Sequence, residues 1–122
     1  MTQEEKQLLL KDLCARLPYG VKVNFRGNIE ILHEAHIYKS VQTIVGESGI
    51  LYDIGAPNVK PYLRPISSMT ESEIEEHEKT FDLDYSIQGT PYDWLNAHYI
   101  DYRGLIGKGL ALEAPEDMYK TE

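Results

Sequence analysis

Cysteine is nearly absent from this 122-residue chain, which contains only Cys14. A lone cysteine cannot form an intramolecular disulfide, so we expect a fold without cross-links and a reducing compartment. Long apolar runs are missing as well. Charges interrupt the short cluster in the N-terminal stretch MTQEEKQLLLKDLC, which resembles neither a secretory signal nor a membrane span of about 20 apolar residues. We therefore expect a cytoplasmic protein without membrane contact.

Basic residues are scarce in the chain. It has 12 lysines and arginines against 20 aspartates and glutamates, which gives a formal net charge of -8. Such a surface repels phosphate backbones unless the bases cluster, so nucleic-acid binding is disfavoured. Between residues 71 and 93 there are eight acids and a single base, Lys79. A solvated helix face followed by a loop explains this stretch, and a surface for a basic partner is the alternative.

Recognisable catalytic and metal-binding motifs are also missing. The sequence contains no glycine-rich phosphate loop and no GxSxG turn. His33 and His36 are three positions apart in a strand-like region, where alternation sends their side chains to opposite faces. We therefore expect no metal, no cofactor and no enzymatic activity.

What the sequence does contain is the pattern of one α+β domain. Its length suits a single domain over residues 1–122, with a helix over 1–17, a strand-rich half over 19–66 and a mostly helical half over 70–119. Thr2 and Glu5 form a capping-box pattern that begins the helix. An apolar stripe follows at helical spacing until Pro18: Leu9, Leu10, Leu13, Cys14 and Leu17. Cys14 is therefore expected to be buried.

The period of the apolar residues changes to two after residue 19. Residues 21–25 and 29–31 alternate around a turn and predict a β-hairpin, and further strands are predicted over 37–45 and 50–54. A short strand near Tyr62 is flanked by prolines, which place it at a sheet edge. Four or five short strands favour a small antiparallel sheet or an SH3-like barrel.

Two or three short helices are predicted in the C-terminal half. Thr70 and Glu73 repeat the capping box, and Thr90 with Pro91 has the pattern of another helix start. Asp101 is predicted to be an N-cap of a short helix that ends at Gly109, and a final strand is expected over 110–113.

The stretch 92–111 is rich in aromatic and polar residues. Caps and core packing account for most of it, which leaves His98, Tyr102 and Arg103 without an assigned structural role. We select these three as candidates for an interaction surface. Nine tyrosines in the chain support such a surface, because tyrosine tolerates partial burial and is enriched at interfaces.

Three segments carry a resemblance to a known family: KDLCARLPYGVKV (11–23), VKPYLRPISSMTESE (59–73) and DWLNAHYIDYRGLIGKGLALEAPEDMY (93–119). In these segments the chain resembles a family of small proteins of uncharacterised function from gut Bacteroidales and their phages and mobile elements. The resemblance implies a short cytoplasmic accessory protein of phage or mobile-element origin. It implies no activity, cofactor or catalytic residue. Gly107 departs from the family pattern, where a charged helix former is expected.

Three functional hypotheses follow from the sequence. The first is a non-enzymatic module that binds another protein, or itself, through an acidic and tyrosine-rich face. The second is nucleic-acid association through a basic face in the strand-rich half, or its converse, a DNA mimic that occupies a DNA-binding protein. The basic candidates are Lys22, Arg26, Lys39, Lys60 and Arg64. The third is a small enzyme that uses Asp101 together with His98, Tyr102 and Arg103.

Overall fold

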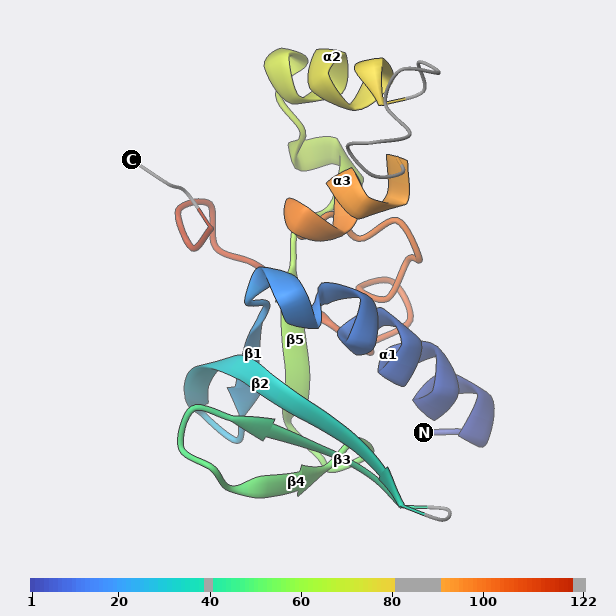
Figure 1. The fold of residues 1–122 in the computed structure, drawn as a ribbon, viewed down its shortest axis with the longest axis vertical. Coiled ribbons are helices and arrows are strands. Elements are labelled where there is room, and N and C mark those ends of the chain that lie inside the picture. The colour runs from blue at the N-terminus through green and yellow to red at the C-terminus, as the bar shows by residue number, and fades with distance from the viewer. Residues whose placement is uncertain (39–40, 81–90, 120–122) are drawn as a thin grey trace.

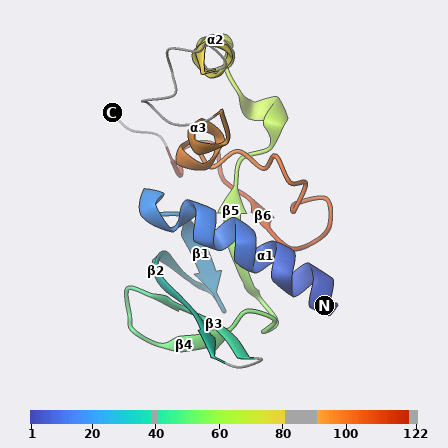
Figure 2. The same cartoon turned by 45° about the vertical axis from the view of Figure 1, so that its right-hand side comes forward.

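The computed structural model describes residues 1–38, 41–80 and 91–119 and has an α+β architecture (Figure 1). An N-terminal helix packs on one sheet, and short helices extend away from that sheet (Figure 2). The helices are α1 (Gln3–Arg16), η1 (Leu17–Tyr19), η2 (Ile66–Ser68), α2 (Glu71–Lys79) and α3 (Pro91–Ala97). The strands are β1 (Lys22–Phe25), β2 (Asn28–Tyr38), β3 (Val41–Gly46), β4 (Leu51–Asp53), β5 (Val59–Leu63) and β6 (Leu112–Glu113).

The six strands lie in the order β4-β3-β2-β1-β5-β6. The predicted number of four or five strands was therefore too low. The sheet is also not antiparallel throughout, as predicted, because its last pair of strands is parallel. β6 pairs with β5 in parallel, with Tyr62 opposite Leu112. The final strand predicted over 110–113 is present as β6, shortened to Leu112–Glu113, and only its parallel pairing with β5 was not predicted. The SH3-like barrel stays a prediction.

Helix α1 follows its sequence signals closely. The Thr2 hydroxyl accepts a hydrogen bond from the Glu5 N–H, and the Glu5 carboxylate accepts one from the Thr2 N–H. Leu9 and Leu13 enter the core. Cys14, however, is exposed, which contradicts its predicted burial. The buried face of the helix instead turns toward Asp12 and Arg16.

The sheet supplies the other side of the core. Val23 and Phe25 of β1 and Leu63 of β5 are fully buried against α1. The predicted hairpin joins β1 to β2 through Arg26 and Gly27, both with positive φ, the backbone geometry of a type I′ turn. β2 then changes partner: residues 28–31 pair with β1, and from Leu32 onward it pairs with β3, with an irregularity in that pairing between Leu32 and Glu34.

Strand β5 lies inside the sheet, between β1 and β6, and not at the predicted edge. Proline is tolerated here because of register. Lys60 pairs with Asn24 and Pro61 with Val23. Since hydrogen-bonded and non-bonded pairs alternate, the nitrogen of Pro61 faces the β6 side, and β6 pairing begins only at Tyr62.

The helical half is only partly as predicted. The capping box of Thr70 and Glu73 begins α2, which buries none of its residues. Thr90 lies outside the described residues, and α3 begins at Pro91. No helix forms over residues 102–109, and Asp101 is not the predicted N-cap. Its carboxylate accepts hydrogen bonds from the N–H groups of Leu105 and Ile106, four and five residues on, whereas an N-cap binds the N–H two or three residues on. The chain makes successive turns there, and Gly104 and Gly109 have positive φ.

Figures 1 and 2 both place α3 between α1 and α2, so that α2 lies farthest from the sheet. Within the described ranges, no helix has the length and apolar character that a membrane crossing requires.

Candidate functional site

An open cleft of about 870 Å³ lies where the C-terminal segment passes the helical half of the molecule. Its lining comes from residues within 19–22, 64–76, 97–99 and 114–119, together with Ile31. These segments are far apart in the sequence and meet only in the folded chain. We refer to this feature as the cleft.

Tyrosines 19, 99 and 119 form one wall of the cleft. The rings of Tyr99 and Tyr119 stack with centroids 3.8 Å apart and an interplanar angle of 17°. The Tyr99 hydroxyl donates a hydrogen bond to the backbone carbonyl of Tyr19. Burial raises the pKa of both the Tyr99 and the Tyr119 hydroxyls, so both rings present neutral surface at neutral pH.

Tyr99 occupies a backbone position that usually belongs to glycine. It follows the end of α3 with a φ of 61°. The N–H of Ile100 donates to the carbonyl of Leu95, and the N–H of Tyr99 donates to that of Asn96, which together form a Schellman motif. A side chain in this left-handed conformation costs about 1 kcal/mol relative to glycine. The fold thus accepts local strain at the residue that brings an aromatic ring to the cleft.

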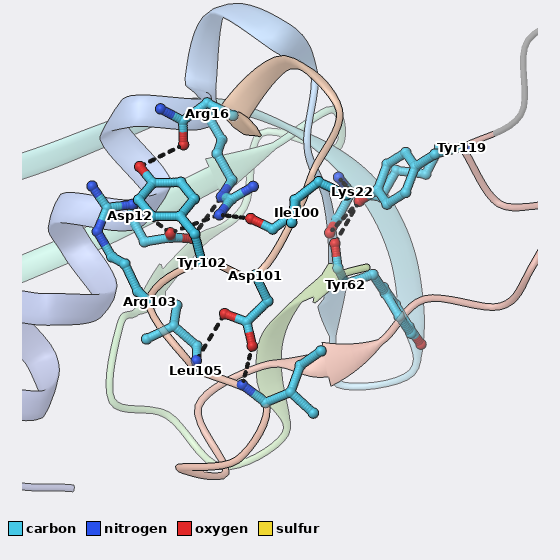
Figure 3. A network of polar contacts seen from close by, with 12 residues as sticks. Asp12, Arg16, Lys22, Tyr62, Ile100, Asp101, Tyr102, Arg103, Leu105 and Tyr119 are labelled. Carbon is cyan, nitrogen blue, oxygen red and sulfur yellow. Dashed lines mark hydrogen bonds and ion pairs between the residues drawn. The ribbon is translucent and has the colours of Figure 1, made fainter. Parts of the chain in front are cut away.

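Tyr119 attaches the C-terminal segment to the sheet. The β1–β5 register makes Lys22 and Tyr62 the next pair expected to exchange backbone hydrogen bonds. The Tyr119 hydroxyl instead stands between them, accepting from the Lys22 N–H at 2.9 Å and donating to the Tyr62 carbonyl at 2.8 Å (Figure 3). A side chain thus replaces a sheet hydrogen bond and fixes the tyrosine wall.

Arg64 and Glu73 form the opposite wall. Their side chains make a bidentate ion pair, with N–O distances of 2.8 and 2.7 Å. Glu73 also accepts the N–H of Thr70 at the start of α2. The hydrogen bonds from Arg64 lower the pKa of Glu73 to about 2. The ion pair therefore holds the polar helix α2 against the end of β5, and it neutralises the charge of Arg64.

The remaining charges give the cleft an acidic character. Besides Arg64, the basic residue that lines the cleft is Lys22. The Nζ of Lys22 donates to the backbone carbonyl of Met118 at 3.0 Å. Glu76 and Glu116 also line the cleft, and both are exposed. Neither makes an ion pair within residues 1–38, 41–80 and 91–119. Two carboxylates therefore remain available to a ligand.

Of the three predicted surface residues, His98 alone lines the cleft. Its ring stacks on Trp94 at 3.8 Å, and its Nδ1 lies 2.9 Å from the Trp94 carbonyl oxygen. Trp94 also contacts His77 of α2, with ring centroids 5.4 Å apart. His98 thus belongs to the aromatic contact between α2 and α3.

Tyr102 and Arg103 have structural roles that the sequence did not reveal. Arg16 of α1 pairs with Asp12 through two hydrogen bonds of 2.9 and 3.0 Å, and both side chains are fully buried. Arg103 binds the same carboxylate at 2.7 Å, and its guanidinium lies over the Tyr102 ring (Figure 3). The two residues therefore complete a buried network and do not line the cleft.

The four residues of the enzyme hypothesis do not share a pocket in this arrangement. Asp101 accepts backbone N–H groups, Tyr102 donates to the Asn96 side chain at 3.0 Å, and Arg103 pairs with Asp12. His98 lies in the cleft without them. Across the described parts of the chain, no three His, Cys, Asp or Glu side chains are grouped so that they could hold a metal ion.

Sequence reasoning found neither Asp12 and Arg16 of the buried network nor Tyr119 of the cleft. The signal for Asp12 and Arg16 was present, because the two are four apart on the predicted helix. Nothing local marked Tyr119, whose hydroxyl meets a backbone 97 residues away. Of the proposed basic face, Arg64 is neutralised by Glu73, and Lys39 lies outside the described residues.

No family model, curated protein or solved structure matches this chain.

Proposed function

We propose that this protein is a non-enzymatic interaction module whose cleft binds an extended, basic segment of another protein. The observation that carries the proposal is the chemistry of the cleft: three tyrosines line it, its lysine and arginine are already engaged, and Glu76 and Glu116 are unpaired. Aromatic walls with carboxylates suit an extended peptide that presents lysine or arginine.

The same charges argue against the other partners. A phosphate backbone would meet the two unpaired carboxylates against a single unpaired cation, Lys22, in the described part of the cleft. A second copy of the chain would bring its own net charge of -8 to an acidic surface. A basic partner is the one for which the electrostatic contribution is favourable.

We also propose an SH3-like arrangement of the strands and a cytoplasmic accessory role. An SH3-like arrangement of β1–β5 is supported by the change of partner along β2 and by the irregularity between Leu32 and Glu34, because a bulge bends the strand that carries it. A cytoplasmic accessory role in a phage or mobile element is supported by the resemblance of the segments 11–23, 59–73 and 93–119.

The proposal is tested with a fluorescent decapeptide of alternating lysine and valine, whose binding to the full chain is followed by anisotropy. The Glu76→Lys/Glu116→Lys variant should weaken binding about tenfold, because it reverses both unpaired carboxylates. The control variant Glu75→Lys/Glu78→Lys changes the net charge equally on exposed residues of α2 that do not line the cleft. It should weaken binding about twofold.

Salt and peptide charge provide further checks. Binding should weaken as salt is added, and a glutamate–valine decapeptide should not bind. Equal losses in the two double variants would show a generic charge effect and would overturn the cleft as the site. So would the absence of binding by the lysine–valine peptide at low ionic strength.

A further inference from the structure

The first half of β2 has a sheet neighbour on one side only. Residues 28–31 pair with β1, whereas pairing with β3 begins at Leu32, opposite Gly46. At Gly46 the chain turns away, since the N–H of Gly49 donates to the Gly46 carbonyl. The side of β2 that would continue the β3 pairing is therefore open before Leu32.

The register identifies which backbone groups face that open side. The N–H of Leu32 donates to the Val21 carbonyl, toward β1. Because the direction alternates along a strand, the N–H of Ile31 points the other way, and it meets the Glu47 carboxylate at 2.9 Å. Ile29 shares the direction of Ile31. Neither the N–H nor the carbonyl of Ile29 has a partner within the described parts of the chain.

A pocket of about 480 Å³ adjoins this strand. Ile29, Ile31, Pro115 and Met118 contribute apolar lining, and the side chain of Ile29 is 52% exposed. An exposed isoleucine beside unpaired backbone is the arrangement that an added strand covers: its main chain binds the edge, and one of its side chains fills the pocket.

Charge and continuity indicate the occupant. Glu30, Glu47 and Asp117 line this pocket, against the single cation Lys22. Lys22, Ile31, Pro115 and Met118 line both the pocket and the cleft, so one ligand can extend from one into the other. A second copy of this acidic chain would be repelled, whereas a segment rich in lysine or arginine would be attracted.

We infer that the basic partner segment continues from the cleft onto β2 and adds a short strand at Ile29. The main chain of the segment accepts a hydrogen bond from the Ile29 N–H and donates one to the Ile29 carbonyl. An apolar side chain packs on Ile29 and Met118, and a cationic side chain faces the carboxylates of Glu47 and Asp117. This inference rests on the proposed function and adds the mode of recognition.

The decisive variant is Ile29→Pro. Proline removes the N–H that faces the open edge and leaves the hydrogen bonds to β1, which Ile29 does not make. Affinity for the lysine–valine decapeptide should fall about tenfold, whereas the Ile29→Val control, which keeps the N–H, should change it less than about twofold. A Pro variant that binds as tightly as Val overturns the inference.

Hydrogen exchange in the unaltered chain gives an answer that does not depend on folding of the Pro variant. With the decapeptide bound, exchange of the Ile29 amide should slow at least about tenfold, and the Ala97 and His98 amide resonances should shift in NMR spectra. Shifts at Ala97 and His98 without protection at Ile29 would overturn strand addition and leave the cleft proposal standing. Protection at Ile29 alone would overturn the cleft and support the edge. No response at either place would overturn both.

Discussion

Arg16 is a charged residue with no exposed surface, and its partner Asp12 is equally buried. Removing one member of such a pair leaves an uncompensated charge in the interior. We expect Arg16→Met to lower the free energy of unfolding by about 3–5 kcal/mol, measured by urea denaturation. The remaining contact from Arg103 does not replace the two hydrogen bonds that Arg16 makes to Asp12.

Two further variants define what this first experiment measures. Lys11→Met replaces an exposed charge on the same helix and should change stability by less than about 0.5 kcal/mol. The double variant Asp12→Leu/Arg16→Met removes both charges and should recover part of the loss. A loss below about 1 kcal/mol in Arg16→Met would show that Arg103 alone compensates the charge of Asp12.

The contribution of the Tyr119 hydroxyl to stability can be measured with one substitution. Tyr119→Phe keeps the ring stacked on Tyr99 but removes the group between Lys22 and Tyr62. It should cost about 1–3 kcal/mol, because two backbone groups lose their partner. If the stability were unchanged at neutral pH, the two strands would have closed the gap directly, and the hydroxyl would be dispensable.

The pKa of Tyr119 adds a pH signature to the same variant. Burial raises its folded-state pKa above the unfolded value of 10.0, so its contribution is complete below about pH 10 and is lost as the pH rises toward the folded pKa. Above pH 10 the original chain should lose stability more steeply than Tyr119→Phe. Denaturation series from pH 7 to 11 compare the two slopes.

Among the elements, α2 depends most on a single ion pair. It buries no residue, and Glu73 connects it to Arg64. The pKa of Glu73 is about 2 in the folded chain against 4.5 ordinarily, so its stabilisation is present above pH 4.5 and is lost as the pH falls toward 2. We expect Glu73→Gln to lower stability by about 1–3 kcal/mol at pH 7 and by much less at pH 2.

Glu71→Gln is the matched control for the Glu73 experiment, since Glu71 also lies in the first turn of α2 but makes no ion pair with a described residue. It should change stability by less than about 0.5 kcal/mol at either pH. A Glu73→Gln loss that is the same at pH 7 and pH 2 would assign the effect to the capping box and not to the ion pair.

The elements that could be predicted are those with local signals. The two capping boxes gave the starts of α1 and α2, and alternation with a turn gave the β1–β2 hairpin. β5 was misplaced because the cost of Pro61 depends on which neighbour its nitrogen faces, a property of the sheet and not of the segment. The helix predicted over 102–109 failed because the Asp101 carboxylate binds the N–H groups of Leu105 and Ile106, beyond the reach of an N-cap, and so closes a loop instead of starting a helix.

The candidate site was the part that sequence reasoning could reach least. His98 was identified, but through the absence of another explanation and not through its neighbours. Tyr102 and Arg103 were selected for the same reason, and their partners Asn96 and Asp12 became visible only with the chain folded. The cleft combines four segments, so no window of sequence contains it.

At the scale of the whole molecule, stability should fall with distance from the sheet. The core lies between α1 and the sheet and extends to Leu105 and Leu110, whereas α2 lies at the far end without a buried residue (Figure 1). Local opening requires little energy where few apolar contacts are lost. We expect the amides of α2 to exchange at least about a hundredfold faster than those of Leu9 to Leu13 in α1, followed by NMR in deuterated buffer.

This decrease in stability from the sheet to α2 also affects ligand binding. Thr70, Glu73 and Glu76 of the α2 region form one wall of the cleft, and Tyr99 and Tyr119 on the other wall are attached to the body of the molecule. A ligand that bridges both walls must oppose the opening of α2, because opening removes half of its contacts. Adding the lysine–valine decapeptide should therefore slow α2 exchange selectively and leave the exchange of α1 almost unchanged. If α2 were as protected as α1 without the peptide, this decrease in stability would be absent, and unchanged α2 exchange with peptide bound would place the ligand elsewhere.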